Sequence, residues 1–261
     1  MRPTNFLCCG LFLSLIGIAH QASAQHKAPA PLPPPAGKPK TYQAHRATAP
    51  VVIDGTLNAS EWKRAKWTDN FVDIEGSAKP KPRVRTRAKM LWDDQYLYIA
   101  AELQEPDIKA SITRHDAVIF HDNDFELFLK PLPDQDAYFE FEMNALNTGW
   151  DLYLNKPYRF GGHADNSFEL EGLKTAVALH GTLNNSGDTD EGWTLEIAIP
   201  WTAFASRQSV PQPQVGTTWR INFSRVEWKP GNPREDNWVW SPQGVINMHV
   251  PERWGYLAFK K

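Results

Sequence analysis

Four glutamates occupy alternate positions of short, otherwise apolar segments, and they are the first side chains in the sequence that could do chemistry. They are Glu126, Glu140, Glu142 and Glu196. Paired carboxylates roughly 5–10 Å apart hydrolyse glycosidic bonds, and one sheet face offers such distances. Basic residues such as Arg85, Arg87 and Arg220 alternate in other segments in the same way. Ordinary cross-strand ion pairs are therefore the alternative interpretation, and no spacing singles out two of the four glutamates.

A short acidic run precedes one of these segments and could hold a metal ion. Asp122, Asn123 and Asp124 follow one another directly. Calcium binds six to eight such oxygens, including backbone carbonyls. The alternative is that these residues bond to the local backbone of a turn. We expect a structural calcium ion, with these three residues as candidate ligands.

Two tryptophans lie in a long segment, residues 229–250, that is rich in proline, glycine and asparagine. Trp238 and Trp240 are two positions apart, so they point to the same side of an extended chain. An indole ring can stack on the apolar face of a sugar, while neighbouring amides and carboxylates bind its hydroxyl groups. The sequence therefore predicts a sugar platform here. The alternative is that a ring packs beneath the loop as part of the core.

Other common catalytic motifs do not occur in the sequence. There is no G-x-S-x-G nucleophile motif, no H-E-x-x-H zinc motif, and neither the G-x-x-x-x-G-K nor the G-x-G-x-x-G phosphate-binding loop. The sequence thus gives no support for nucleophilic, zinc or nucleotide chemistry.

The elements that must position these side chains are strands. Apolar and polar residues alternate with period two over residues 84–92, 95–103, 124–130, 138–144, 192–200 and 219–228. Such alternation is typical of half-buried strands. Only residues 59–65 and 201–205 indicate short helical turns. Many strands without intervening helices predict an all-β fold, an antiparallel β-sandwich of the jelly-roll or immunoglobulin-like type.

Composition excludes several classes of protein. Aromatic residues make up 12% of the 261 residues, which is too many for a disordered chain. The net charge of −2 and the pI near 6.4 argue against a nucleic-acid-binding protein. They also give no electrostatic reason for binding at a membrane surface.

The N-terminal region is read as a signal peptide followed by a tether. Residues 1–24 combine Arg2, an apolar run too short to span a membrane, and a small-residue cleavage site. Export to the periplasm or the extracellular space follows. Both cysteines, Cys8 and Cys9, lie in this segment, so the mature chain has none. Residues 25–41 form a proline-rich tether, and residues 42–261 form the folded domain.

Five motifs, in order, resemble the family 9 carbohydrate-binding modules and their DOMON-like relatives. These motifs span the domain: Val52-Ile53-Asp54-Gly55 with Glu61-Trp62, Leu91-Trp92-Asp93-Asp94, Asn123-Asp124-Phe125-Glu126, Gly192-Trp193-Thr194-Leu195-Glu196, and Trp254-Gly255-Tyr256-Leu257. The resemblance implies a β-sandwich with bound calcium and a sugar site, without catalytic activity. Such modules bind the ends of plant polysaccharides or small sugars, and the protein would assist glycoside hydrolases.

The resemblance also implies which residues contact the sugar. The two rings that sandwich a terminal sugar fall on Phe120 and Trp240, and a glutamate that bonds sugar hydroxyls falls on Glu126. The sequence departs from the family twice: the first ring is usually tryptophan, and Glu140 replaces a basic residue. Further polar candidates are Asn144 and Arg225. Arg225 shares the register of apolar neighbours, so a buried ion pair is its alternative role.

Two other functions remain open at this point. Some DOMON-like relatives carry haem, and Met143, Met248 and His249 could supply axial ligands. A glycoside hydrolase using two of the strand glutamates is the third candidate.

Overall fold

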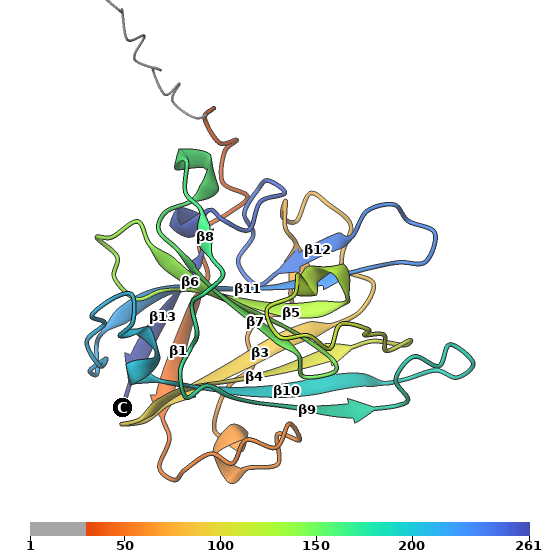
Figure 1. The fold of residues 1–261 in the computed structure, drawn as a ribbon, viewed down its shortest axis with the longest axis horizontal. Coiled ribbons are helices and arrows are strands. Elements are labelled where there is room, and N and C mark those ends of the chain that lie inside the picture. The colour runs from red at the N-terminus through yellow and green to blue at the C-terminus, as the bar shows by residue number, and fades with distance from the viewer. Residues whose placement is uncertain (1–29) are drawn as a thin grey trace, which may run out of the picture.

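The computed structural model describes residues 30–261, and the predicted signal peptide lies outside them (Figure 1). The strands are β1 (Thr41–Arg46), β2 (Val72–Asp73), β3 (Thr86–Trp92), β4 (Tyr96–Gln104), β5 (Asp124–Lys130), β6 (Tyr138–Asn144), β7 (Gly149–Leu154), β8 (Ala164–Asp165), β9 (Lys174–His180), β10 (Gly192–Pro200), β11 (Thr218–Glu227), β12 (Asp236–Val239) and β13 (Gly255–Lys260). Short 3-10 helices are η1 (Ser60–Lys63), η2 (Ile119–His121), η3 (Tyr158–Phe160), η4 (Trp201–Phe204) and η5 (Pro251–Arg253). Among these residues, no helix has the length and apolar character to cross a membrane.

The strands form one curled sheet that folds into two layers. Its hydrogen-bonded order is β8-β7-β6-β5-β11-β13-β1-β3-β4-β10-β9. In Figure 1, β5, β6 and β11 lie above β3, β4, β10 and β9. Strand β11 joins the layers, because β13 pairs with its first half and β12 with its second half. The predicted β-sandwich is confirmed.

One pairing differs from the purely antiparallel expectation. Strand β1 runs parallel to both β13 and β3, and it lies between them. The chain therefore enters the sandwich between its last strand and its first hairpin. The other paired strands run antiparallel, as the alternating pattern predicted.

The core fills the space between the layers with the apolar side of each alternating strand. Phe125, Leu127 and Leu129 of β5 face inward, together with Phe139, Phe141 and Met143 of β6. Trp193 and Trp219 lie in the same cluster. The polar side of β5 and β6 consequently faces away from the core.

Glu196, one of the four glutamates, holds a loop in place on the other layer. Its carboxylate accepts backbone N–H groups of Asp54 and Gly55 at 2.7 Å and the indole N–H of Trp62 at 2.5 Å. Gly55 has φ of 81°, and a Cβ there would lie 2.6 Å from the backbone carbon of Val177. Glu196 is therefore saturated by structural hydrogen bonds and lies apart from the other three glutamates.

The end of the proline-rich segment lies against the domain. Arg253 donates to the Pro33 carbonyl, and the backbone N–H of Lys40 donates to Ser241 Oγ at 3.3 Å. The Lys40 carbonyl in turn accepts the Tyr256 N–H at 2.8 Å. The structure thus attaches residues 33–40 to the side of the sandwich near η5.

Candidate functional site

Four carboxylates gather on the outward face of β5 and β6, and we call them the acidic cluster. They are Asp124, Glu126, Glu140 and Glu142. Their positions follow from register, because Glu126 is directly opposite Glu142 across the two strands and alternation places Asp124 and Glu140 on the same face. All four are at most 4% exposed, since surrounding loops cover the sheet face.

Several polar atoms of this face have no hydrogen-bond partner. They are Asp124 Oδ2, Glu126 Oε2, Glu140 Oε2, Ser224 Oγ and Trp150 Nε1. Two other oxygens bond to the protein: Asp124 Oδ1 accepts the Val226 N–H at 2.9 Å, and Glu142 Oε2 accepts the Phe120 N–H at 3.1 Å. Buried polar groups are normally paired. This group of unpaired buried polar atoms on one face is therefore a candidate ligand site.

Burial raises the pKa of every member of the acidic cluster. It raises the pKa of Glu126 to about 7, and repulsion from Glu126 raises the pKa values of the other three further. The imidazole nitrogen Nδ1 of His249 lies 3.9 Å from Glu140 Oε2. Burial lowers the pKa of His249 to about 4, so it is neutral at pH 7. The cluster therefore lacks a positive partner there.

This arrangement predicts an unusual pH dependence for the protein without bound ligands. The folded-state pKa of Glu126, about 7, exceeds its ordinary 4.5. The contribution of Glu126 to the stability of the fold is therefore most favourable below pH 4.5 and is lost as pH rises through 7. As pH rises from 4.5 to 8, the free energy of unfolding of Glu126→Gln should increase by about 3 kcal/mol relative to that of the wild type. Urea unfolding of both proteins in chelator at the two pH values measures this difference, and a constant difference would contradict the prediction. Burial lowers the pKa of His249, so its own contribution to the pH dependence of stability has the opposite sign. This contribution is present in both proteins and cancels in the difference between them.

Two exposed aromatic rings flank the acidic cluster. Phe120, on η2, is 37% exposed, and its ring centroid lies 6.3 Å from that of Trp150. The indole N–H of Trp228 holds the Phe120 carbonyl at 2.8 Å. Tyr158, on η3, is 44% exposed and packs edge-on against His249 at 4.6 Å. Burial raises the pKa of Tyr158, and the charges of Glu140 and Glu142 raise it further.

The predicted platform of Trp238 and Trp240 is wrong, because both rings belong to the core. Trp240 is 2% exposed, and Trp238 is 3% exposed. The Trp240 ring packs 6.1 Å from Phe223 and leaves no room for a side chain at position 255. Residues 236–239 form β12 rather than an open loop, and this strand continues the sheet beside β11. Both tryptophans are therefore core residues, which was the alternative interpretation of the sequence.

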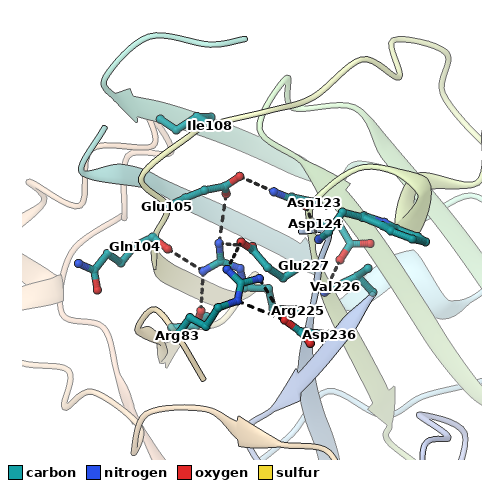
Figure 2. A network of polar contacts seen from close by, with 12 residues as sticks. Arg83, Gln104, Glu105, Ile108, Asn123, Asp124, Arg225, Val226, Glu227 and Asp236 are labelled. Atoms are coloured by element: carbon teal, nitrogen blue, oxygen red, sulfur yellow. Dashed lines mark hydrogen bonds and ion pairs between the residues drawn. The ribbon is translucent and has the colours of Figure 1, made fainter. Parts of the chain in front are cut away.

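Arg225 forms a buried ion pair and takes no part in the outward face (Figure 2). It is fully buried, and its guanidinium donates to Glu227 at 2.6 Å and to Glu105 at 3.2 Å. It also donates to Thr86 Oγ1 at 3.0 Å and to the Gln104 carbonyl at 2.9 Å. Its apolar register directs it inward, so the ion-pair alternative is correct and the sugar-contact prediction is wrong.

Asn144 is likewise committed to structure. Its amide nitrogen donates to the Ile112 carbonyl at 2.8 Å and to Asp122 at 2.9 Å. Its amide oxygen accepts the backbone N–H groups of Leu146 and Thr148. Asn144 therefore orders the turn between β6 and β7 and offers no free group to a ligand.

The three predicted calcium ligands do not converge on one point. Asp122 accepts the backbone N–H groups of Ser111 and Ile112, both at 2.8 Å. Asn123 donates to Glu105 and accepts the Trp228 N–H. Only Asp124 points into the acidic cluster. Asp122 and Asn123 therefore fit the turn alternative, and the three residues do not fit a shared ion.

Two of the residues considered for haem, Met143 and His249, lie on opposite sides of the sheet. Met143 is fully buried in the core between the layers. His249 lies on the outward side, where its Nδ1 is 2.8 Å from the Tyr138 hydroxyl. The sheet separates the two side chains, so they do not fit as a pair of axial ligands.

A second polar group lines a cleft of about 730 Å³ at the open edge of the sandwich. His115 Nε2 lies 3.2 Å from Glu169 and within 3.6 Å of Asp116 and Asp151. Burial lowers the pKa of His115, but these carboxylates outweigh that effect and raise it overall. The carboxylates therefore favour the protonated form of His115, whereas burial favours the neutral form of His249 beside the acidic cluster.

Two solved structures that share this fold are described as carbohydrate-binding proteins. A candidate carbohydrate-binding protein from Bacteroides uniformis superimposes with a TM-score of 0.64 at 18% identity, over 85% of this chain and 99% of that one. A family 9 carbohydrate-binding module from Caldicellulosiruptor kristjanssonii, in complex with cellotriose, superimposes with a TM-score of 0.59 at 18% identity. This match covers 85% of this chain and 94% of that one. At this identity the likeness establishes the fold.

The sequence match is more specific than the structural one. The model of the carbohydrate family 9 binding domain-like proteins matches residues 53–261, and the chain belongs to this family. The resemblance carried by the five motifs is thereby confirmed.

Curated relatives are much longer proteins. Exoglucanase XynX of Acetivibrio thermocellus is 28% identical over 58% of this chain and 12% of its own length. Endo-1,4-beta-xylanase C of Paenibacillus barcinonensis is 28% identical over 57% of the chain and 11% of its own length. The chain therefore spans about a tenth of these enzymes.

Proposed function

We propose that the protein is an exported, non-catalytic carbohydrate-binding module whose sugar site is the acidic cluster between Phe120 and Tyr158. The observation that carries this proposal is the combination of unpaired buried acceptors with two exposed rings from separate loops. Membership of a carbohydrate-binding family and the cellotriose bound by a structural neighbour support it.

The chemistry of the face suits a sugar unit. Aromatic rings stack on the apolar C–H face of a pyranose. Carboxylates accept hydrogen bonds from its hydroxyl groups, and a few placed polar groups fix orientation in such sites. Glu126 and Glu140 have free oxygens for this purpose, and the unpaired indole N–H of Trp150 can donate to a sugar oxygen.

The spacing of the carboxylates supports binding rather than hydrolysis. Oxygens of Asp124, Glu126 and Glu142 all lie within 4.8 Å of one another. A hydrolase needs its two carboxyl groups about 5–10 Å apart, on either side of the scissile bond. Side by side on one face and nearly closed to solvent, these groups do not flank a glycosidic bond.

Glycan breakdown is the setting that the relatives suggest. The relatives are named as an exoglucanase and endo-1,4-beta-xylanases. We place this protein outside the cytoplasm through its predicted signal peptide, where it would hold poly- or oligosaccharides for separate glycoside hydrolases.

Retention on a glycan array tests the proposal and its site together. Wild-type protein should bind a subset of β-glucans, xylans or their oligosaccharides. Phe120→Ala and Tyr158→Ala should each weaken binding about tenfold, because each removes a stacking surface. Phe160→Ala is the matched control for Tyr158→Ala. Phe160 is 45% exposed on the same short helix, η3, but its ring packs against Arg159.

Two outcomes would count against the site. Equal loss in Phe160→Ala would indicate a general disturbance of η3. Unchanged binding in the Phe120 and Tyr158 variants would place the sugar elsewhere.

A further inference from the structure

We propose that the cleft beside His115 holds a structural zinc ion, bound by one imidazole and three carboxylates. The ligands are His115, Asp116, Asp151 and Glu169. The inference does not depend on sugar binding, and it uses none of the oxygens of the acidic cluster.

The sheet separates this cleft from the acidic cluster. Asp151 is opposite the core residue Phe141 in the pairing of β6 and β7, so it lies on the inward side of the sheet at its open edge. Its neighbour Trp150 is opposite Glu142 and therefore lies on the outward side. A ligand in the cleft and a sugar on the outward face would occupy different sites.

Three segments that are distant in the sequence bring the four ligands together. The first two ligands lie in the turn before η2, the third lies in β7, and the fourth lies between β8 and β9. The Asp116 N–H donates to the Gly149 carbonyl at 3.1 Å, and Asp151 Oδ2 accepts the Leu170 N–H. These hydrogen bonds hold the ligand positions together without an ion. The separation of the segments also explains why the sequence shows no zinc motif.

A single imidazole N–H cannot satisfy the acceptors around it. His115 Nε2 lies 3.2 Å from Glu169 Oε2, within reach of a hydrogen bond. Asp116 Oδ1 and Asp151 Oδ1 lie 3.5 and 3.6 Å from the same nitrogen, and both are buried without a hydrogen-bond partner. Asp151 is 2% exposed, and buried carboxylate oxygens normally have a partner. The unpaired oxygens therefore point to a ligand that bonds to several of these side chains at once.

The charge of the group requires that this ligand be a cation. Protonation of His115 offsets only one of the three negative charges around it. Arg207 lines the same cleft, but Asp165 binds its guanidinium at 2.8 Å. A divalent ion offsets two of the charges, and it accepts the lone pair of the neutral imidazole at the same time.

The separations and the donor set identify zinc. Zinc–nitrogen and zinc–oxygen bonds are about 2.0–2.2 Å long, so neighbouring ligand atoms of a tetrahedron lie about 3.3–3.6 Å apart. The three oxygens lie 3.2–3.6 Å from His115 Nε2, and ligand atoms of His115, Asp116 and Asp151 lie within 4.8 Å of one another. Imidazole favours zinc, whereas calcium takes oxygen ligands. The site therefore differs from the calcium site that the family resemblance implies.

Zinc titration of the untagged mature chain, first freed of metal by a chelator, tests this proposal without any glycan. We expect saturable binding of one zinc ion per chain by calorimetry and a melting temperature raised by several degrees. Cobalt, a spectroscopic probe of zinc sites, should give the intense visible bands of a tetrahedral complex. His115→Gln and Asp151→Asn should each lower the zinc affinity about tenfold or more and remove these bands.

Both substitutions are chosen to keep the fold. The His115 side chain is 54% exposed, and an asparagine amide oxygen at position 151 can still accept the Leu170 N–H. His45→Gln is the matched control, because His45 is an exposed histidine on β1 whose Nδ1 lies 3.0 Å from the Lys261 carbonyl oxygen. It should keep the zinc affinity and the cobalt bands.

The proposal is overturned if the wild type shows no saturable zinc binding or if His115→Gln retains the wild-type affinity. An equal loss in His45→Gln would also overturn it, since zinc would then bind to surface histidines in general. Excess calcium should not displace the cobalt. Displacement by calcium would show a site of oxygen ligands and would contradict the role of His115.

Discussion

Replacing Trp240 with alanine is expected to lower the free energy of unfolding by about 3–5 kcal/mol. The ring is 2% exposed and fills the space between Phe223 and Gly255. Removing it leaves a cavity that the surrounding strands cannot close, because the sheet fixes their positions. Urea unfolding followed by circular dichroism measures the loss.

Phe120→Ala is the control for this experiment. Phe120 is 37% exposed, so its loss should change the free energy of unfolding by less than about 1 kcal/mol while weakening glycan retention. A stable Trp240→Ala protein that fails to bind glycans would contradict this assignment and would restore Trp240 as a sugar platform.

The second large effect is expected at Arg225. Arg225→Met should cost about 3–5 kcal/mol, because it keeps the volume of the side chain but leaves Glu105 and Glu227 buried without their cation. Both acids are at most 4% exposed. Thermal and urea unfolding measure the loss, and Arg83→Met is the control. Arg83 is partly exposed and 3.6 Å from Glu227, so its replacement should cost about 1 kcal/mol or less.

A double variant separates the ion pair from simple packing. Arg225→Met/Glu227→Gln should recover part of the loss, since it also removes a buried charge. If the double variant is no more stable than Arg225→Met, the guanidinium acts through its hydrogen bonds to Thr86 and the Gln104 carbonyl instead.

Much of the fold could be read from the sequence, because its strands are half-buried and alternate. The segments predicted at 124–130, 138–144 and 192–200 match β5, β6 and β10 residue for residue. Strand β12 was not predicted, because Pro, Gly and Asn surround it in the sequence and its four residues are too few to show an alternating pattern. Tertiary pairing with β11 makes it a strand, and this is why Trp238 and Trp240 were misplaced.

The candidate site was predictable only in part. The alternation of β5 and β6 placed Glu126, Glu140 and Glu142 on one face, and the family resemblance selected Phe120. No sequence pattern pointed to Tyr158, because it lies on η3, a single helical turn after β7. It lies near the outward face of β5 and β6 through packing against His249. Loops that meet across a fold have no common sequence period.

Hydrogen-bond partners distinguish functional carboxylates from structural ones in this protein. Glu196 and Asp122 looked like binding candidates in the sequence, yet backbone N–H groups and neighbouring side chains saturate them. Glu126 and Glu140 are equally buried but keep free oxygens. Glu196 and Glu126 share residue type and position in an alternating strand, so only the folded surroundings separate their two roles.

A crystal structure of the protein with a bound oligosaccharide tests the central claim most directly, using a glycan that the array identifies. We predict a sugar unit against Phe120 or Tyr158, with hydroxyl groups bonded to Glu126 and Glu140. A sugar bound instead in the cleft beside His115 and Asp151, or none at saturating concentration, would contradict the proposed site.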